Sequence, residues 1–537
     1  MNKFFSITIG LFILILPALS AQEALKSIEE EYYDFLALQG LTERPTLNFR
    51  TLSDSVWNVK EGASHPWENQ KLGTAFHFFD KLHLKIYGPE LFMSFNTAAP
   101  YGQNDGALWQ GRGFNTSLTA GARFEAYGAE LTLKPQLSFS QNWEFDYMTP
   151  EGMTGANYAG KAQKYGYFWG TIDAPQRFGD KPFFTFDWGD SEVRYTWKTL
   201  TIGFGTQPIW LGPAYLNPIL HSNNAPSYPK LDIGLRKQRI VIPKVNWYWG
   251  DVEARIWTGY LSESDYFDNN DANDHTMIHG LSFAYSPPGV LSGLTLSVNR
   301  IALVPWEWEN LIYIFPGAVN ADAEGYVSAE DQKISLGVSW VFPKAGLEIY
   351  GEIGMDDYIS GGLVGYIRDP AWTMVYLSGL KKTIPIVPEK QIFGELFFEA
   401  NWFDNSLGSG NHSITWYSYY RHGGIQQGYT NGGQWLGNAA SPGGNSQSLG
   451  FVVYYPQGKS SIMLNRANPD SDFMYHFAYG TRANRAVFNL DLQTSYYISS
   501  FLIFGGLTYN LIIGDFYTKE NTKIHNFSIQ LGVKWTL

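Results

Sequence analysis

Two pairs of acidic residues come closest to a catalytic pattern in this sequence of 537 residues. Glu348 and Glu352 lie four positions apart, as do Glu395 and Glu399, so each pair shares one face of an extended segment. A glycoside hydrolase needs two carboxyl groups about 5 to 10 Å apart across a sugar. Four residues along a strand separate such a pair by roughly 13 Å. Acids on neighbouring strands could still meet, but these side chains fit the charged lining of a polar interior better, and we expect no catalytic residue.

A serine beside a histidine is a second arrangement that could do chemistry, in this case ester hydrolysis. The adjacent pairs are Ser64–His65, His221–Ser222 and His412–Ser413. None of them lies in a recognisable nucleophile motif, and the sequence contains neither Gly-x-Ser-x-Gly nor His-Glu-x-x-His. A lipid hydrolase is therefore the least favoured function.

An acidic stretch has the composition of a calcium-binding loop. If the loop began at Asp268, its sixth position would be Asn273 rather than glycine, and its twelfth would be His279 rather than glutamate. An EF-hand requires both of the missing residues. We expect a solvated outer loop here and no metal site, with incidental binding of a divalent cation as the alternative.

Two further segments combine aromatic rings, amides, cationic side chains and glycines. The first runs from Phe204 to Lys230, and the second from Trp416 to Asn445. Aromatic rings offer flat faces to the C–H groups of sugars, while amides and arginine bind hydroxyls and carboxylates. The alternative is that the two segments pack on each other and fill the interior of the fold. The candidate polysaccharide-binding residues are Trp210, His221, Asn224, Tyr228, Lys230, Arg236, Arg421, His422, Tyr429 and Trp435.

The elements that must position these residues are β-strands. From Phe527 to Leu537, apolar and polar residues alternate without a break, which predicts a strand with one apolar face and one polar face. The segments 127–140, 251–260, 294–299 and 395–400 alternate in the same way. We count roughly 16 to 20 such segments, each near the ~10 residues that a tilted membrane-spanning strand needs.

The N-terminal region predicts export. Residues 1–21 combine a cationic start, an apolar run and small residues at a cleavage site, as in a secretory signal peptide. Residues 22–69 contain a predicted amphipathic helix over 23–39 and form a segment on the periplasmic side. Residues 70–537 hold the strands. The absence of cysteine excludes disulfides, thiolate metal sites and a lipoprotein anchor.

Composition is consistent with a membrane barrel. Aromatic residues make up 17% of the chain, which suits aromatic girdles at two lipid–water interfaces. After the signal, no apolar run reaches the ~18 residues of a membrane helix, so an exported chain could cross a membrane only as a closed barrel. The net charge of −12 argues against binding to nucleic acid.

Connections between the predicted strands are long on one side. The longest are 147–187, 206–232, 263–275, 305–331 and 401–445, while 102–113 could fold inward. Long loops on one side and tight turns on the other are usual for an outer-membrane barrel. The expected partners therefore include outer-membrane lipids.

The end of the chain resembles the sorting signal of bacterial outer-membrane barrels, which the barrel assembly machinery reads. The residues that carry this resemblance are Gln530, Gly532, Trp535 and Leu537. Most such signals end in an aromatic residue, and Leu537 departs from that pattern.

Three spaced motifs resemble the Wzi-type capsule assembly proteins. They are Trp210-Leu-Gly-Pro213, Ser222-Asn-Asn-Ala-Pro226, and Arg421-His422 followed by Gly428-Tyr429, Gly433 and Gly437. The resemblance implies a closed antiparallel outer-membrane barrel of about 18 strands, with a small helical part facing the periplasm. It also implies a lectin-like, noncatalytic role in attaching or organising capsular polysaccharide. Where that family has a helical bundle, this sequence has one clear helix.

The leading hypothesis is a monomeric outer-membrane protein that binds capsular or other surface polysaccharide through its outer loops, without a cofactor. The alternative is a porin or sugar channel. An acidic polymer would need cations on the binding face, and the densest basic run is Lys230, Arg236, Lys237, Arg239 and Lys244. For Arg239 and Lys244, charge balance inside the barrel is the favoured role.

Overall fold

The computed structural model describes residues 20–22, 25–70, 72, 75–77, 82–147, 165–166, 172–268, 270–271, 273–315, 330–356, 364, 367, 374–403, 419–469, 485–514 and 522–536. Most of the predicted signal peptide, residues 1–21, falls outside them. No helix in the described part of the chain is long and apolar enough to cross a membrane.

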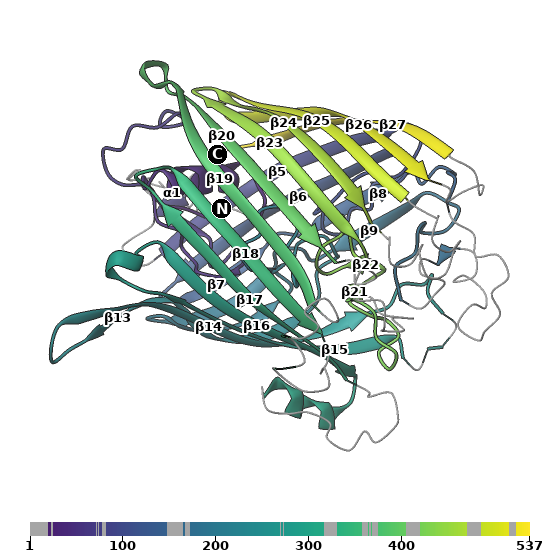
Figure 1. Cartoon of the computed structure of the whole chain (residues 1–537), viewed down its shortest axis with the longest axis horizontal. Helices are drawn as coiled ribbons and strands as arrows, with labels where there is room; N and C mark the ends of the chain where they lie inside the picture. Colours follow the sequence, from purple (N-terminus) through teal and green to yellow (C-terminus); the bar gives the residue numbers. More distant parts are fainter. Residues whose placement is uncertain are drawn as a thin grey trace, which may run out of the picture.

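One antiparallel sheet forms the wall of the molecule and closes on itself (Figure 1). Closure occurs where β27 pairs with β5, from Ser528 opposite Asn96 to Lys534 opposite Glu90. The wall strands are β5 (Leu82–Asn96), β6 (Gly113–Ala126), β7 (Ala129–Leu133), β8 (Gln136–Ser140), β9 (Phe183–Asp187), β10 (Glu192–Trp197), β11 (Leu200–Gly205), β13 (Lys230–Ile242), β14 (Trp247–Ser262), β15 (His275–Ser286), β16 (Leu294–Pro305), β17 (Asp331–Phe342), β18 (Leu347–Asp356), β19 (Met374–Val387), β20 (Ile392–Trp402), β23 (Asn445–Tyr455), β24 (Gly458–Asn468), β25 (Arg485–Ile498), β26 (Phe501–Gly514) and β27 (Thr522–Trp535).

Two of the crossings are interrupted strands. Both β7 and β8 pair with β6, so they are two halves of one crossing, and their partners β10 and β9 form the next crossing. Counted in this way, the described residues form a closed barrel of 18 antiparallel strands, which confirms the predicted fold. The short strand β4 (Ala75–His77) adds a further pairing to β5.

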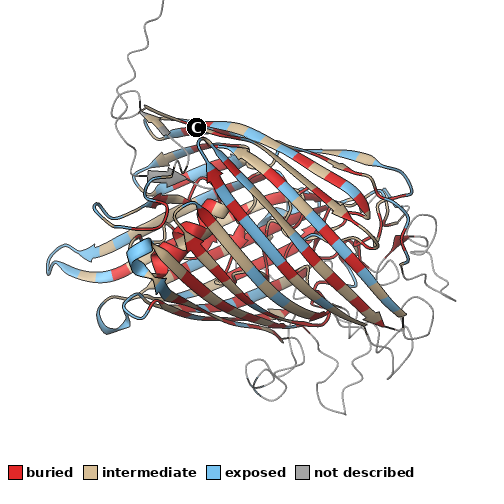
Figure 2. Ribbon diagram, turned by 90° about the horizontal axis from the view of Figure 1, so that it is seen from above, coloured by how far each residue is buried: buried red, intermediate tan, exposed pale blue. Residues whose placement is uncertain are grey.

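The predicted alternation is confirmed along the wall. In β27, Ile529 is 56% exposed on the outside, while Ser528 is fully buried on the inside. In β14, Glu253 and Arg255 are buried in the lumen. Figure 2 shows the same alternation as bands of buried and exposed residues along the strands. The barrel therefore has an apolar outer surface and a polar lumen.

The two ends of the barrel differ in their connections. Turns of two residues join β6 to β7, β10 to β11, β23 to β24 and β25 to β26, all at the end where β27 finishes. We call this the short-turn end. The connections at the opposite, long-loop end are much longer, for example residues 97–112 and 206–229. In outer-membrane barrels short turns face the periplasm and long loops face the outside.

Helix α1 (Ile28–Leu38) lies inside the ring of strands at the short-turn end (Figure 1). The Ser27 side chain accepts a hydrogen bond from the Glu30 amide at its start, and Gly40, with φ of 70°, follows its end. Phe35 stacks on Tyr454 of the wall with ring centroids 4.2 Å apart. The helix is shorter than the predicted 23–39, and it packs inside the lumen because its apolar residues meet aromatic residues of the wall there.

The remaining short elements lie in the connections. Two-stranded pairs form between β1 (Ser20–Gln22) and β3 (Val56–Asn58), β2 (Phe49–Arg50) and β12 (Trp210–Leu211), and β21 (Thr430–Asn431) and β22 (Gln434–Trp435). Among the described residues, the 3-10 helices are η3 (Gly289–Leu291), η4 (Trp308–Ile314) and η5 (Pro388–Lys390).

Candidate functional site

Four segments fold into the lumen and together form what we call the plug, residues 25–70, 97–112, 206–229 and 419–444. Strand β2 of the first segment pairs with β12 of the third, with Trp210 opposite Arg50. The Ser222 amide donates to the Leu436 carbonyl at 2.7 Å, and the Gly106 amide donates to the Asn223 carbonyl at 2.9 Å. The prediction that 102–113 folds inward is confirmed by these bonds, and so is the alternative that the two aromatic segments pack on each other.

Carboxylates of the wall hold the backbone of the plug. Glu399 of β20 accepts hydrogen bonds from the amides of Tyr215, Leu216 and Asn217 at 2.7 to 3.2 Å. Glu253 of β14 similarly accepts from the three amides of residues 47–49 at 2.7 to 3.0 Å. Hydrogen bonds from several N–H groups stabilise the charge of a buried carboxylate. They also give a partner to backbone amides of an irregular segment.

One member of each predicted acid pair, Glu348 and Glu399, is part of this anchoring. The Glu348 carboxylate accepts hydrogen bonds from both terminal nitrogens of Arg44 at 2.6 Å, and it lies 3.6 Å from the Lys381 ammonium. Glu399, of the other pair, binds plug backbone as described above. These contacts give both acids a structural role in the lumen.

Four of the predicted binding residues are buried at the centre of the plug. His221 Nε2 and the Tyr228 hydroxyl lie 2.6 Å apart, and the Tyr429 hydroxyl lies 3.3 Å from His221 Nδ1. Burial lowers the pKa of His221 to about 4, so the ring is neutral at physiological pH. Trp210 is also fully buried and donates from Nε1 to the Ala214 carbonyl at 3.0 Å. These side chains join the two inward segments.

The structure does not present the predicted cations Lys230 and Arg236 on a free surface. Lys230 is 3% exposed and donates to the Gln207 carbonyl. Arg236 pairs with Asp54 at 2.7 Å and with Glu130 at 2.9 Å. Both side chains have their partners inside the barrel, because the polar face of β13 points into the lumen, where these carboxylates and the carbonyl lie.

Arg421 and His422 are half-buried near the start of the last plug segment. His422 Nδ1 accepts hydrogen bonds from the amides of Gly424 and Ile425 at 3.1 and 3.2 Å. This residue therefore shapes a local turn.

A cavity of about 650 Å³ separates the plug from the wall formed by β23 to β27 and β5. Asn224 and Trp435 line it and are the two predicted binding residues that do so. Asn224 donates to the Trp435 carbonyl at 3.1 Å, so the two plug segments present these side chains together. Other aromatic and amide residues of the lining include Tyr101, Gln103, Asn104, Trp109, Gln110, Phe145, Phe178 and Gln434.

The wall of the cavity carries a ladder of asparagines. Asn465, Asn489 and Asn510 are direct partners on β24, β25 and β26. Asn489 Nδ2 donates to Asn465 Oδ1 at 3.3 Å, and Asn510 Nδ2 donates to Asn489 Oδ1 at 2.5 Å. Asn526 follows on β27, opposite Asn510, and accepts from the plug amides of residues 98 and 99. These four asparagines were not among the predicted site residues, although each lies on the polar face of a wall strand.

Several acceptors of the lining have no protein partner among the described residues. They are Asn104 Oδ1, Gln110 Oε1, Asp491 Oδ2 and Asn510 Oδ1. Buried acceptors of this kind are costly unless a ligand or water donates to them. The cavity therefore offers hydrogen-bond acceptors beside aromatic rings.

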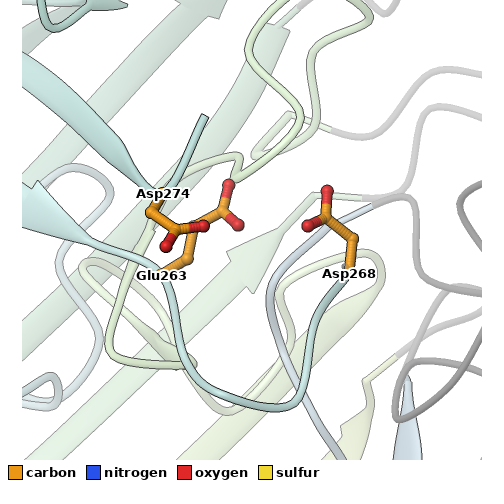
Figure 3. Close-up of side chains that lie close together, drawn as sticks. All are labelled: Glu263, Asp268 and Asp274. Atoms are coloured by element: carbon orange, nitrogen blue, oxygen red, sulfur yellow. The ribbon is translucent and has the colours of Figure 1, made fainter. Parts of the chain in front are cut away.

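The acidic loop brings three carboxylates together, Glu263, Asp268 and Asp274, with ligand atoms within 4.8 Å of one another (Figure 3). Burial raises the pKa of Glu263 to about 9, and the charges of Asp173, Asp268 and Asp274 add to this shift. The protonated form of Glu263 therefore prevails at neutral pH. Carboxylates of a surface loop commonly gather in this way without a cation, so we assign no metal to the cluster.

Comparison with known proteins identifies the family to which this chain belongs. Residues 94–468 match the family described as capsule assembly protein Wzi, whereas no curated protein matches the chain at a significant level. Among solved structures, the chain is similar to Escherichia coli Wzi, which is described as an outer-membrane protein involved in group 1 capsule assembly and as a carbohydrate-binding β-barrel. Sequence identity is 14%, the TM-score is 0.51, and the match covers 83% of this chain and 84% of that one.

A second similar structure is Pseudomonas aeruginosa OccD3, with 9% identity, a TM-score of 0.41, and coverage of 86% of this chain and 93% of that one. The family match spans more than half of the chain and includes most of the wall and three of the four plug segments. This protein is therefore an outer-membrane β-barrel that belongs to the Wzi family of capsule assembly proteins.

Proposed function

We propose that this protein binds capsular or other surface polysaccharide at the outer membrane and helps to attach or organise it there, without catalysing a reaction. The cavity between plug and wall carries the proposal, because its aromatic rings lie beside unpartnered hydrogen-bond acceptors. A saccharide presents C–H faces to such rings and hydroxyl donors to such acceptors. The carbohydrate binding reported for Escherichia coli Wzi supports the same assignment.

Within this proposal, Asn224 and Trp435 contact the sugar, because they line the cavity. The buried residues of the plug centre keep those two in position. Arg421 and His422 are proposed contacts for an acidic polymer, since they are half-buried rather than enclosed. Many weak contacts along a repeating polymer add up through avidity, so one shallow site per sugar unit suffices.

A porin or sugar channel is the alternative, and the plug favours binding over it. The N-terminal segment and three connections pack inside the lumen, and wall carboxylates hold two of these four segments. A continuous water-filled channel would need those segments to leave.

The proposal is tested with Trp435→Ala and Asp491→Asn in a strain that makes its own surface polysaccharide. Loss of a ring face costs about 1 kcal/mol, so Trp435→Ala should weaken binding of purified polysaccharide about fivefold or more. Retention of labelled polysaccharide on cells should fall in parallel, while the amount of folded barrel stays constant.

The matched control is Trp249→Ala, which removes an exposed tryptophan at the short-turn end, away from the cavity. It should retain polysaccharide as the unsubstituted protein does. Normal retention and normal affinity in both cavity variants would contradict the proposed function.

A further inference from the structure

The outside of the barrel carries a polar cluster where an apolar surface is expected. Gly280 of β15 and Ile301 of β16 face the lumen, against the Trp257 ring and the central core respectively. Strand alternation therefore places His279 and Arg300 on the outward face, with Gln332 beside them on β17. A charged side chain on the lipid face of a barrel is destabilising. Yet His279 is 0% exposed and Arg300 is 6% exposed, so protein rather than lipid covers them.

The covering element is η4, which folds back over the outside of the wall against β14, β15 and β16 (Figure 1). The Asn310 carbonyl lies 3.1 Å from His279 Nε2, and the Tyr313 carbonyl accepts from Arg300 Nη1 at 2.8 Å. Gln332 Oε1 accepts from Arg300 Nε at 2.9 Å. Backbone carbonyls of η4 thus supply hydrogen-bond partners to the outward polar cluster.

The exposed side of η4 is mostly apolar and aromatic, with Glu309 as an acidic residue among the exposed ones. Trp308 is 85% exposed, Ile312 is 60% exposed and Phe315 is 66% exposed. Trp306, just before η4, packs edge-on against Tyr260, with ring centroids 4.6 Å apart. Because Tyr260 lies on the outward face of β14, the exposed patch continues the lipid-facing surface of the barrel.

We propose that η4 is embedded in the outer leaflet of the outer membrane, with its aromatic side at the boundary between headgroups and acyl chains. The segment leaves β16 at the long-loop end, which faces the outside in barrels of this type. Tryptophan and phenylalanine on one side of a short segment favour this boundary. A second copy of the chain is a poorer occupant, because a stable protein interface takes about 20 residues a side.

Single-cysteine labelling provides a clean test, because the chain contains no cysteine. Trp308→Cys and Ile312→Cys are each labelled with an environment-sensitive dye and reconstituted into phosphatidylcholine vesicles. Quenching is measured with phospholipids that carry a nitroxide near the headgroup and with iodide in the water. Both side chains are mostly exposed, so their replacement leaves the covered polar cluster intact; heat-modifiable gel mobility confirms that each barrel is folded.

Two reference positions calibrate the result. Ile529→Cys reports the lipid-facing wall, and Asp271→Cys reports an exposed outer loop. We expect the η4 labels to be quenched by the nitroxide lipid within about twofold of Ile529→Cys, and several-fold less by iodide than Asp271→Cys. Iodide quenching equal to that of Asp271→Cys at both η4 positions would overturn the proposal, because the patch would then face water or a soluble partner.

Discussion

Glu31 of α1 and Lys459 of β24 form an ion pair that ties the N-terminal helix to the barrel wall. Lys26 also lies 3.1 Å from the Glu31 carboxylate. Burial raises the pKa of Glu31, but the charges of Lys459 and Lys26 outweigh burial and hold it at about 2. The fold therefore favours the ionised carboxylate, and the anchoring of α1 depends on it.

The contribution of Glu31 to stability should be lost in acid. Because its folded pKa lies below the ordinary 4.5, the stabilisation is present above about pH 4.5 and disappears as the pH falls towards 2. We expect protection of the α1 amides against hydrogen exchange, corrected for intrinsic rates, to decrease across this window. Glu31→Gln should flatten the change, whereas Glu61→Gln, on an exposed turn, should leave it as it is. Equal acid sensitivity in the two variants would contradict this role.

The buried ring of Tyr429 should hold the two inward segments together. Its ring lies beside that of His221 in segment 206–229, with centroids 6.1 Å apart, and stacks on Tyr420 of its own segment with centroids 5.4 Å apart. Removing a buried aromatic ring costs about 3 to 5 kcal/mol, whereas removing one hydrogen bond costs about 1 kcal/mol. Tyr429→Ala should therefore expose the plug to protease, while Tyr429→Phe should remain close to the unsubstituted protein. Similar cleavage rates for both would mean that the hydroxyl, rather than the packing, holds the segments.

Removal of the Glu399 carboxylate should release the third plug segment. Glu399→Leu leaves the three amides of residues 215–217 without their acceptor, at about 1 to 3 kcal/mol for each buried donor. In planar bilayers we expect larger and more frequent openings than in the unsubstituted barrel. Glu389→Leu, on the exposed turn at η5, is the matched control and should not change conductance. High conductance in the unsubstituted protein would favour the porin alternative.

The barrel could be predicted from the sequence because each membrane-spanning strand contacts two different environments. Each wall strand shows one side to lipid and the other to the polar lumen, so residues such as Leu131 and Glu130 alternate in hydropathy. This alternation depends only on residues close together in the sequence, and it is present even where β7 and β8 form two halves of one crossing. The strand count remained a range because the weaker segments are short.

The site was only partly predictable, because the direction of a loop is not a local property. Aromatic and amide residues mark 206–229 and 419–444 equally well as outer binding loops or as a plug. Glu399 holds 206–229 inward through the amides of residues 215–217, and Glu253 does the same for residues 47–49; both are distant in sequence from the amides that they bind. The asparagine ladder was missed for a similar reason, since strand register brings Asn465, Asn489 and Asn510 together.

Ionisation of Asp105 should make the cavity sensitive to pH. It lines the cavity and accepts from Gln110 Nε2 at 2.7 Å. Burial raises the pKa of Asp105 to about 7, although its hydrogen bonds from Gln110 and the Gln103 backbone oppose the shift. Because the folded pKa lies above the ordinary 3.8, the contribution of Asp105 to stability is full below about pH 4 and declines as the pH rises through 7. The inward loop 97–112 should therefore lose order between about pH 6 and 8.

Polysaccharide affinity should follow that ionisation, since loop 97–112 supplies Tyr101, Asn104 and Trp109 to the cavity. We expect affinity to fall as the pH rises from 6 to 8. Asp105→Asn cannot ionise, and its amide oxygen can still accept from Gln110, so its affinity should stay nearly constant over this range. Asp271→Asn, on an exposed loop, should behave as the unsubstituted protein does. If the affinity of Asp105→Asn falls with pH as steeply as that of Asp271→Asn, a group other than Asp105 governs the pH response. The pH dependence would then give no support for a role of loop 97–112 in the binding site.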